Sequence, residues 1–356
     1  MALALSLGRR GHGRTAPNPA VGCVIVAAGR IVGRGWTQPG GRPHAEVVAL
    51  AQAGDQARGA TVYVTLEPCA HYGKTPPCAE ALIAAGVSRV VVATGDPDPR
   101  VSGQGLDMLR AAGIAVDTGL MQDAARQDLA GFLSRLTQQR CQVTLKLAAS
   151  FDGRIATGTG QSQWITGPEA RRAVHAMRAR HDAVMVGGGT ARSDDPSLTV
   201  RGLGTGHQPA RVVVSRRLDL PLMGVLARTA AEVPVILCHG TDADPALQET
   251  WRGLGATLLT CRTVGAHLDP QDVLSQLASH GVGTVFCEGG GALAASLVEA
   301  DLVDRFVGFT AGLAIGAEGL PSVGALGLSH LDNARRFALR RSQRIGADLM
   351  HEWVRV

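Results

Sequence analysis

The sequence predicts an α/β protein of two domains. Short apolar strands alternate with helical stretches along almost the whole chain, which is the pattern of sheets covered by helices. This alternation stops at a polar stretch, residues 137–140, and then begins again. A length of 356 residues also favours two domains, at about 100–200 residues each. We therefore expect a first domain over residues 1–140 and a second over residues 141–356.

The first domain alternates short strands with helices. Its first residues are apolar and read as a helix, and two strands around Ala-Ala-Gly-Arg form a hairpin. Prolines directly before Cys78 suit the start of a helix. A longer amphipathic helix is expected at 121–136. The other expected strands and helices are strands 21–26, 31–35, 61–65, 89–93 and 114–118, and helices 44–53, 78–85 and 106–112.

The second domain repeats the alternation with longer helices. Its expected strands are 143–147, 183–186, 212–215, 235–238 and 284–287. Its expected helices are 168–179, 270–280 and 292–300, and residues 337–356 read as β-rich. Glycine-rich turns follow two of these strands, at residues 187–189 and 289–291. Such turns let backbone N–H groups approach a diphosphate, although they also serve ordinary tight connections.

Composition excludes several classes of protein. Hydrophobic residues make up 45% and charged residues 18%, which excludes a disordered chain. No apolar run approaches the roughly 20 residues that span a bilayer. Arg9 and Arg10 follow the first apolar stretch, whereas a secretory signal has its charge in front, so we expect a retained segment and a cytoplasmic protein. Aromatic residues, at 3%, argue against a stacking groove for single-stranded nucleic acid.

Charge and cysteine usage narrow the classes further. A net charge of +5 would help attract phosphorylated substrates, and a solvated basic surface explains it equally well. Seven cysteines without a secretory signal indicate a reducing compartment, where cysteine is a metal ligand or a small core residue. The chain has only two lysines, Lys74 and Lys146, and each stands beside a motif.

A zinc site is predicted in the first domain. His44 and Glu46 open an expected helix, and Cys69 and Cys78 each follow a proline. One imidazole and two thiolates supply three zinc ligands and leave the fourth position to water. Zinc-bound water ionises near pH 7, and Glu46 is placed to carry its protons. The alternative is a partly exposed histidine, a surface glutamate and two core cysteines. The full set favours zinc held by His44, Cys69 and Cys78, with Glu46 as the catalytic residue.

The cysteine spacing separates this chain from most nucleobase deaminases. These share the His-x-Glu…Pro-Cys arrangement but usually continue with Cys-x-x-Cys, whereas eight residues separate Cys69 from Cys78. The intervening loop carries His71 and Lys74, a cationic pair that suits a phosphorylated substrate. The segment Thr65-Leu-Glu-Pro-Cys-Ala-His-Tyr-Gly-Lys-Thr-Pro-Pro-Cys-Ala79, with Pro17-Asn-Pro-Ala-Val-Gly22 upstream, resembles the bifunctional deaminase/reductase family of riboflavin biosynthesis. Ala70 stands where that family usually has serine.

The second half resembles the reductase half of the same family. It lacks the Gly-x-Gly-x-x-Gly fingerprint. Its motifs follow the family's order: Lys146-Leu-Ala-Ala-Ser-Phe-Asp-Gly-Arg154, then Ser162-Gln-Trp-Ile-Thr-Gly167, then a glycine-rich turn running on to Arg201, then Glu288-Gly-Gly. The resemblance implies a cytidine-deaminase-like α/β/α sandwich followed by a dihydrofolate-reductase-like domain, with zinc and NADPH as cofactors.

The resemblance also implies residue roles. The implied NADPH contacts are Ala148, Trp164, Thr190, Asp194, Ser215, Gly290, Gly291, Ala292, Leu293, Ala294, Ala295 and Ser296. The implied substrate contacts are Asn18, His71 and Lys74 in the first domain and Ser162, Arg178, Leu198, Arg201 and Glu288 in the second. Several alternatives stay open: Asn18 and Asp194 as turn residues, Lys74 as a solvated lysine, and Trp164 as a core aromatic. Arg178 and Arg201 could clamp a phosphate, and Arg216 or Arg217 could hold the NADPH 2′-phosphate.

The predicted function is therefore a two-step enzyme of riboflavin synthesis. The first domain would deaminate 2,5-diamino-6-ribosylamino-4(3H)-pyrimidinone 5′-phosphate, and the second would use NADPH to reduce the ribosyl group to ribityl. Lys146 and Asp194 are candidates for electrostatic or proton-transfer roles in the reduction. Two competing functions are a tRNA or nucleic-acid base deaminase and a non-catalytic zinc-stabilised binding protein. The expected partner is a small phosphorylated pyrimidine, with no nucleic acid or membrane, and the formation of a homo-oligomer stays open.

Overall fold

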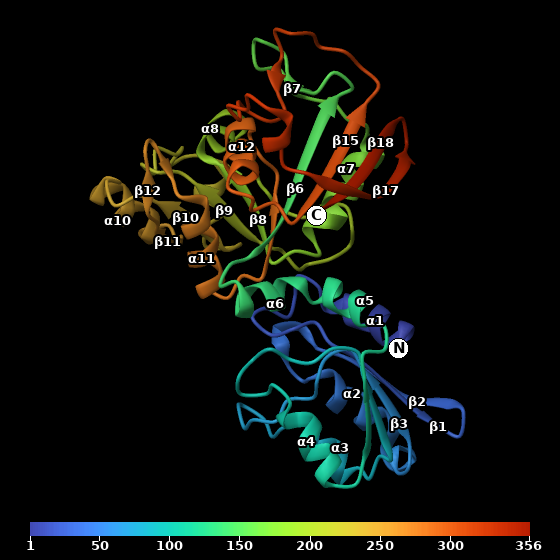
Figure 1. Ribbon diagram of the computed structural model, residues 1–356. Coiled ribbons are helices and arrows are strands. Elements are labelled where there is room, and N and C mark those ends of the chain that lie inside the picture. Colours follow the sequence, from blue (N-terminus) through green and yellow to red (C-terminus); the bar gives the residue numbers. More distant parts are fainter. The chain divides into compact units, whose positions relative to one another are not determined.

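The computed structural model describes all of residues 1–356 and divides them into two compact units, Met1–Gln139 and Arg140–Val356. Each unit has its own sheet (Figure 1). Each also has its own hydrophobic core. None of the helices combines the length and the hydropathy needed to cross a bilayer.

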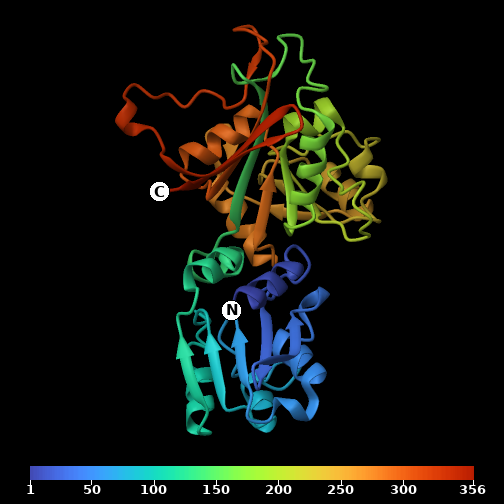
Figure 2. The ribbon, with the colours of Figure 1, turned by 90° about the vertical axis from the view of Figure 1, so that its right-hand side faces the viewer.

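The first unit is built on a five-stranded sheet of order β2-β1-β3-β4-β5. Its strands lie side by side in Figure 2. The hairpin strands pair antiparallel with each other and with β3, whereas β3, β4 and β5 are parallel. The strands are β1 (Gly22–Ala27), β2 (Arg30–Trp36), β3 (Thr61–Val64), β4 (Arg89–Val92) and β5 (Ala115–Thr118). The helices are α1 (Ala2–Gly8), α2 (Ala45–Ala53), α3 (Cys78–Ala84), α4 (Gln104–Ala111), α5 (Gln122–Asp128) and α6 (Ala130–Thr137).

Helices cover both faces of this sheet because successive strand residues point to opposite sides. In β1, Cys23 and Ile25 pack in the large cluster with α2, α3 and α4, while Val24 packs against Ala4 and Leu7 of α1. The predicted α/β/α sandwich is confirmed. So are the hairpin, the first helix and the strands and helices predicted between residues 44 and 118, with boundaries shifted by a residue or two.

The single helix predicted over residues 121–136 is wrong. The structure has two helices, α5 and α6, that meet at Leu129, where φ is −99° and ψ is 6°. Ala125 packs with Leu5 and Ala93, whereas the Leu129 side chain enters the large cluster and is 2% exposed. The break between α5 and α6 therefore lets Ala125 and Leu129 pack in two different clusters. The helical periodicity of the sequence does not reveal such a requirement of tertiary packing.

The second unit is built on a nine-stranded sheet of order β11-β10-β9-β8-β14-β6-β15-β18-β17. All neighbouring pairs are parallel except those of β18 with β15 and β17. The strands are β6 (Gln142–Ser150), β8 (Ala183–Gly187), β9 (Ala210–Val214), β10 (Val235–His239), β11 (Thr257–Thr260), β14 (Thr284–Cys287), β15 (Arg305–Ala311), β17 (Phe337–Ile345) and β18 (Asp348–Arg355). Two small pairs join β7 (Arg154–Ala156) to β16 (Leu320–Pro321) and β12 (Thr263–Val264) to β13 (His267–Leu268).

Six helices accompany this sheet: α7 (Pro168–Arg178), α8 (Gly188–Asp194), α9 (Val225–Arg228), α10 (Pro245–Gly253), α11 (Pro270–Ser279) and α12 (Gly291–Glu299). Residues of α11 and α12 share one cluster with inward strand residues, and those of α8, α9 and α10 share another. Every strand and helix predicted after residue 141 is present, and the β-rich end is confirmed as β17 and β18. The pattern did not predict β11, β15, α8, α9, α10 or the four short strands β7, β12, β13 and β16.

The parallel strands set the position of the second unit's turns. Strand β14 pairs in parallel with β6 and β8, and β8 pairs in parallel with β9, so their carboxyl ends meet at one edge of the sheet. The glycine-rich turns after β8 and β14 are joined there by a hydrogen bond from the Gly187 N–H to the Gly289 carbonyl. In open α/β sheets this edge is where ligands bind.

Candidate functional site

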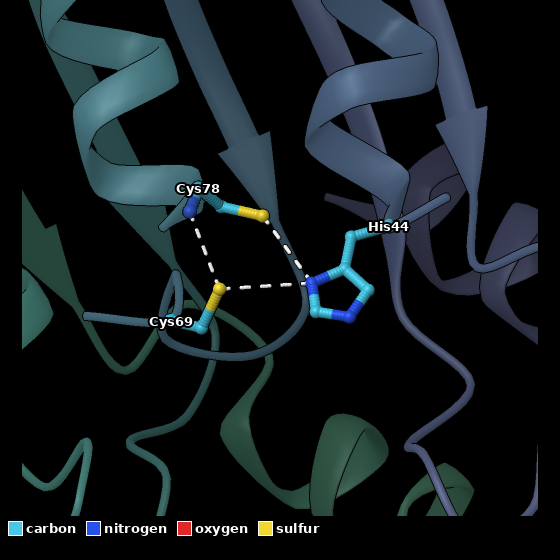
Figure 3. A group of neighbouring side chains, drawn as sticks. All are labelled: His44, Cys69 and Cys78. Atoms are coloured by element: carbon cyan, nitrogen blue, oxygen red, sulfur yellow. Dashed lines mark hydrogen bonds between the residues drawn. The ribbon is translucent and has the colours of Figure 1, made fainter. Parts of the chain in front are cut away.

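Three side chains from separate segments of the first unit converge on one point. His44 is the residue before α2, Cys69 follows β3, and Cys78 is the first residue of α3 (Figure 3). The His44 Nδ1 atom lies 3.6 Å from Cys69 Sγ and 3.3 Å from Cys78 Sγ. In a tetrahedral zinc site, with Zn–S near 2.3 Å and Zn–N near 2.0–2.1 Å, a nitrogen and a sulfur ligand stand about 3.6 Å apart. The donor set therefore fits zinc in both chemistry and spacing.

The local fold prepares these groups to bind a metal. The backbone N–H of Cys78 donates to Cys69 Sγ at 3.2 Å. Hydrogen bonds from the Cys78 thiol and from His44 lower the pKa of Cys69 to about 4, although burial acts in the opposite direction. Cys69 is accordingly a thiolate at neutral pH, and the thiolate is the form that binds a metal.

Glu46 is the second residue of α2, two residues after His44, and is 4% exposed. Burial, followed by the negative charge of Cys69, raises the pKa of Glu46 to about 7. A carboxyl group with a pKa near neutrality can both accept and return a proton, as general acid–base catalysis requires. Glu46 lines the same cavity as His44 and Cys69 and is therefore placed to act on a molecule held there.

The cavity beside the three ligands has a volume of about 260 Å³. Of the predicted residues, it is lined by Asn18, His44, Glu46, Cys69 and His71. Asn18 is held in place, since its Nδ2 donates to the Gly41 carbonyl at 2.8 Å. The buried Nδ1 of His71 has no hydrogen-bond partner, so a ligand could supply one. Lys74 is exposed and does not line the cavity, although it belongs to the same loop as His71.

Charged residues that the sequence reasoning missed also line this cavity. They are Arg42, Glu67, Asp96, Asp98, Arg100 and Arg135. Burial raises the pKa of Asp96 to about 6, whereas the guanidinium of Arg100 holds the pKa of Asp98 below its usual value. Asp96 and Asp98 lie in the loop after β4, and β4 is parallel to β3, which precedes Cys69. Their position after that strand was the signal that could have found them.

Glu67 stands next to the metal-ligand motif but has a structural role. Its carboxylate accepts backbone N–H bonds from four residues, at 3.1 to 3.4 Å. These donors are Asp96, Gly103, Gly105 and Leu106. Glu67 thereby fixes the loop after β4 and the start of α4 against the cavity, and its oxygens are already engaged.

The second unit has a larger cavity, of about 470 Å³, at the carboxyl ends of β8 and β9 and along α12. Four predicted cofactor residues line it: Ser215, Ala292, Leu293 and Ser296. A neighbouring cavity of about 450 Å³ shares Ala292 and Ser296 and adds the predicted Gly291 and Ala295. Gly290 lies at the turn between β14 and α12, where a Cβ atom would stand 2.9 Å from Thr190 Oγ1. Five predicted cofactor residues at the start of α12 therefore form one wall of these two cavities: Gly291, Ala292, Leu293, Ala295 and Ser296.

Other predicted cofactor residues lie outside these two cavities. Ala294 is fully buried on the inner side of α12, and Asp194 is exposed at the end of α8. Ala148 lies on β6. Trp164 is 66% exposed, with the Arg171 guanidinium 4.5 Å from its ring, so the alternative of a core aromatic is wrong. An exposed indole face stays available for a ligand.

Three of the second unit's charged residues form a half-buried group. Arg178 hydrogen-bonds Glu288 through two nitrogens and donates to the Thr199 carbonyl at 2.8 Å. Lys146 Nζ lies 4.0 Å from Glu288 Oε2. Burial lowers the pKa of Lys146. Burial would raise the pKa of Glu288, but Arg178 and Lys146 hold it below its usual value.

The remaining predicted substrate residues differ in how far their side chains are free to contact a ligand. Arg201 forms no ion pair; it donates to Ser197 Oγ at 3.0 Å, and its guanidinium is exposed. Leu198 is 2% exposed, with a φ of 54°, so only its backbone can meet a ligand. Ser162 is half-buried in the segment before α7. The two arginines predicted to clamp a phosphate are therefore not equivalent, since Arg178 already holds a carboxylate.

Comparison with known proteins decides the family. Residues 141–351 match the model of a protein family described as "RibD C-terminal domain". Residues 1–94 match the model of the family "Cytidine and deoxycytidylate deaminase zinc-binding region". The riboflavin biosynthesis protein RibD of Aquifex aeolicus is 41% identical over 350 residues, covering 98% of this chain and 96% of its own length. The chain belongs to the RibD family.

Solved RibD structures agree with the fold over its full length. One form of Acinetobacter baumannii RibD superposes with a TM-score of 0.90 at 38% identity, covering 100% of this chain and 97% of its own. A second structure, from Thermotoga maritima, superposes with a TM-score of 0.87 at 33% identity and with the same coverage. That protein is described as a diaminohydroxyphosphoribosylaminopyrimidine deaminase/5-amino-6-(5-phosphoribosylamino)uracil reductase. The RibD-family chain described above is thus a bifunctional deaminase and reductase of riboflavin biosynthesis, and both predicted domain folds are confirmed.

Removing one metal ligand should release the metal from this RibD-family protein. We expect His44→Ala and Cys69→Ala to lower bound zinc from about one ion per chain to nearly none, because two protein ligands remain. Metal analysis of the purified variants measures this, with the exposed His330→Ala as the matched histidine control. Full zinc occupancy in both ligand variants would contradict the assignment.

Proposed function

We propose that residues 1–140 carry a zinc-dependent deaminase and residues 141–356 an NADPH-dependent reductase. The two would act in turn on 2,5-diamino-6-ribosylamino-4(3H)-pyrimidinone 5′-phosphate. The observation that carries the first activity is the His44, Cys69 and Cys78 donor set, with buried Glu46 lining the same cavity as His44 and Cys69. We propose that the enzyme acts in the cytoplasm on this small molecule and needs no nucleic acid or membrane.

In the deamination, His44, Cys69 and Cys78 would hold the zinc ion. When bound, zinc supplies a water molecule that ionises near pH 7. Glu46 would accept a proton from the attacking water molecule as the oxygen bonds to the carbon bearing the amine. Glu46 would then return the proton to the leaving nitrogen, which departs as ammonia. Asn18 would position the substrate with its free carbonyl oxygen, because its amide nitrogen is bonded to Gly41.

In the reduction, the chain would position the cofactor along the glycine-rich turns. NADPH supplies the hydride that reaches C1′ of the opened ribosyl group. The segment from Gly290 to Ser296, where α12 begins, would receive the diphosphate, and the exposed face of Trp164 would contact the cofactor. Thr190 beside Gly290, Ala148, Asp194 and Ser215 complete the proposed cofactor set.

The charges in the larger cavity favour one arginine for the NADPH 2′-phosphate. Arg216 is paired with Asp242 at 2.7 Å, and Arg192 with Asp219 at 2.9 Å. Arg217 lines the same cavity and forms no ion pair. An arginine without a carboxylate partner can offer its donors to phosphate. We therefore assign the 2′-phosphate to Arg217 rather than Arg216.

The substrate of the reduction would meet Ser162, Arg201, the Leu198 backbone and the Arg178–Glu288 pair. Glu288 is held ionised and could accept hydrogen bonds from ribose hydroxyls. Lys146, beside Glu288, is a candidate to donate a proton or stabilise charge. Arg201 has its guanidinium free of carboxylates and is the proposed phosphate ligand.

Product analysis tests the whole proposal. Purified zinc-loaded protein should release one ammonia per diaminopyrimidine phosphate consumed, without NADPH. Adding NADPH should then oxidise the cofactor in proportion to the deaminated intermediate. Deamination of a tRNA or single-stranded substrate in its place would favour the nucleic-acid deaminase instead.

Replacing Glu46 separates metal binding from proton transfer. Glu46→Gln should keep zinc but lower deaminase kcat by about 10²–10⁴-fold, because the amide cannot shuttle a proton. Steady-state ammonia release and metal analysis of the same preparation measure both properties. Near-normal turnover by a zinc-loaded Glu46→Gln enzyme would refute the role.

Replacing Arg201 tests the phosphate contact in the reductase. Arg201→Ala should raise the reductase KM for substrate about 10- to 150-fold, the effect of losing a charge-assisted hydrogen bond. The KM for NADPH and deaminase turnover should be nearly unchanged. Steady-state kinetics with substrate and cofactor varied separately measure this. An unchanged substrate KM, or weakening chiefly toward NADPH, would show that Arg201 is not the phosphate ligand.

A further inference from the structure

Two of the three arginines that line the deaminase cavity form no ion pair with its carboxylates. Among its cations, Arg100 is bound to Asp98 through two nitrogens. Glu67 is engaged by backbone N–H groups, so it neutralises no side chain. Arg42 and Arg135 line the cavity and form no ion pair. These two guanidinium groups are therefore available to an anionic ligand.

Arg42 is directed to the loop that separates Cys69 from Cys78. It lies between β2 and α2 and is half-buried. Its Nη1 donates to Thr75 Oγ1 in that loop. Its Nη2 lies 3.3 Å from the position a Cβ atom of Gly73 would occupy, and the His71 ring lies 3.9 Å from the same position. Arg42 and His71 thus flank Gly73, and Lys74 is the next residue.

His71 supplies an independent sign that this corner of the cavity receives a ligand. Its Nδ1 atom is buried and has no hydrogen-bond partner in the structure. A buried polar atom without a partner is costly unless a bound molecule satisfies it. The Arg42 guanidinium beside it, held by Thr75, makes a prepared place for an anion.

We propose that Arg42 binds the 5′-phosphate of the deaminase substrate, in company with His71. This inference rests on the proposed deaminase function and adds a residue to it. A guanidinium offers donors in a planar fork that matches two phosphate oxygens, and the Thr75 contact fixes its orientation beforehand. Arg42 consequently determines the preference of the site for a phosphorylated substrate over the corresponding nucleoside.

Arg135 is the rival cation for the phosphate. It comes from α6, and its Nη2 donates to the Pro17 carbonyl at 2.7 Å. Its guanidinium also lies 6.0 Å from the Phe132 ring. Arg135 therefore belongs to the wall that carries Asn18, whereas Arg42 belongs to the loop that carries His71. The two arginines are separable by mutation.

The test compares deamination of the phosphorylated substrate with that of its dephosphorylated nucleoside. For Arg42→Ala we expect kcat/KM to fall about 10- to 150-fold with the phosphorylated substrate and to change little with the nucleoside. Thr75→Val removes a side-chain partner of Arg42 but keeps the guanidinium, so most of the preference for phosphate should remain. The exposed Arg34→Ala on β2 is the matched arginine control and should behave as wild type. Zinc content and reductase activity verify that each variant is folded.

The results that would contradict the proposal can be told apart from one another. An unchanged ratio of the two kcat/KM values in Arg42→Ala overturns the inference and leaves the deaminase function standing. Equal losses with both substrates show that Arg42 only positions the loop, and this also overturns it. Loss of the phosphate preference in Arg135→Ala, and not in Arg42→Ala, assigns the phosphate to Arg135. A zinc-loaded wild-type enzyme that deaminates neither substrate refutes the proposed function itself.

Discussion

The contact of α2 with β2 at backbone distance is the constraint on which the zinc site depends. Gly33 and Gly35 of β2 face this helix, and a Cβ atom on them would stand 2.3 Å from the Ala49 carbonyl and 2.1 Å from that of Ala45. Only glycine permits so close an approach. Because α2 begins at this contact, His44 and Glu46 both lie at the end of the sheet from which the chain runs from β3 to Cys69. A larger residue in β2 would move both the ligand and the proton carrier.

Ion pairing then decides which charges remain free for ligands. In the first unit Arg100 forms an ion pair with Asp98, and Glu67 accepts hydrogen bonds from backbone N–H groups. Arg42 forms no ion pair. In the second unit Asp242 occupies Arg216, and Glu288 occupies Arg178, while Arg217 and Arg201 stay unpaired. Both units bind phosphorylated molecules in the proposed function. We assign those phosphates to Arg42, Arg217 and Arg201, which form no ion pair.

The sequence predicted what depends on local pattern. Alternating apolar runs located most strands, and the residues flanking Cys69 and Cys78 predicted a metal site because ligand spacing and element boundaries are local properties. It failed where long-range packing decides, as at Leu129, which divides the predicted helix, and in the unpredicted β15. It could not distinguish Arg178 from Arg201, since the carboxylate that pairs with Arg178 comes from Glu288, 110 residues away. Arg42 escaped notice for the same reason: its loop partners become neighbours only in the folded chain.

In the proposed function one chain holds two chemically separate activities, of which only the first uses metal. The most direct measurement is to remove zinc with a chelator and assay both reactions on one sample, with zinc restored as a control. We expect ammonia release to be lost and NADPH oxidation on the deaminated intermediate to be retained. Ammonia release should recover when zinc is restored. Ammonia release that persists without zinc, or a reductase that fails together with the deaminase while the chain stays folded, would contradict it.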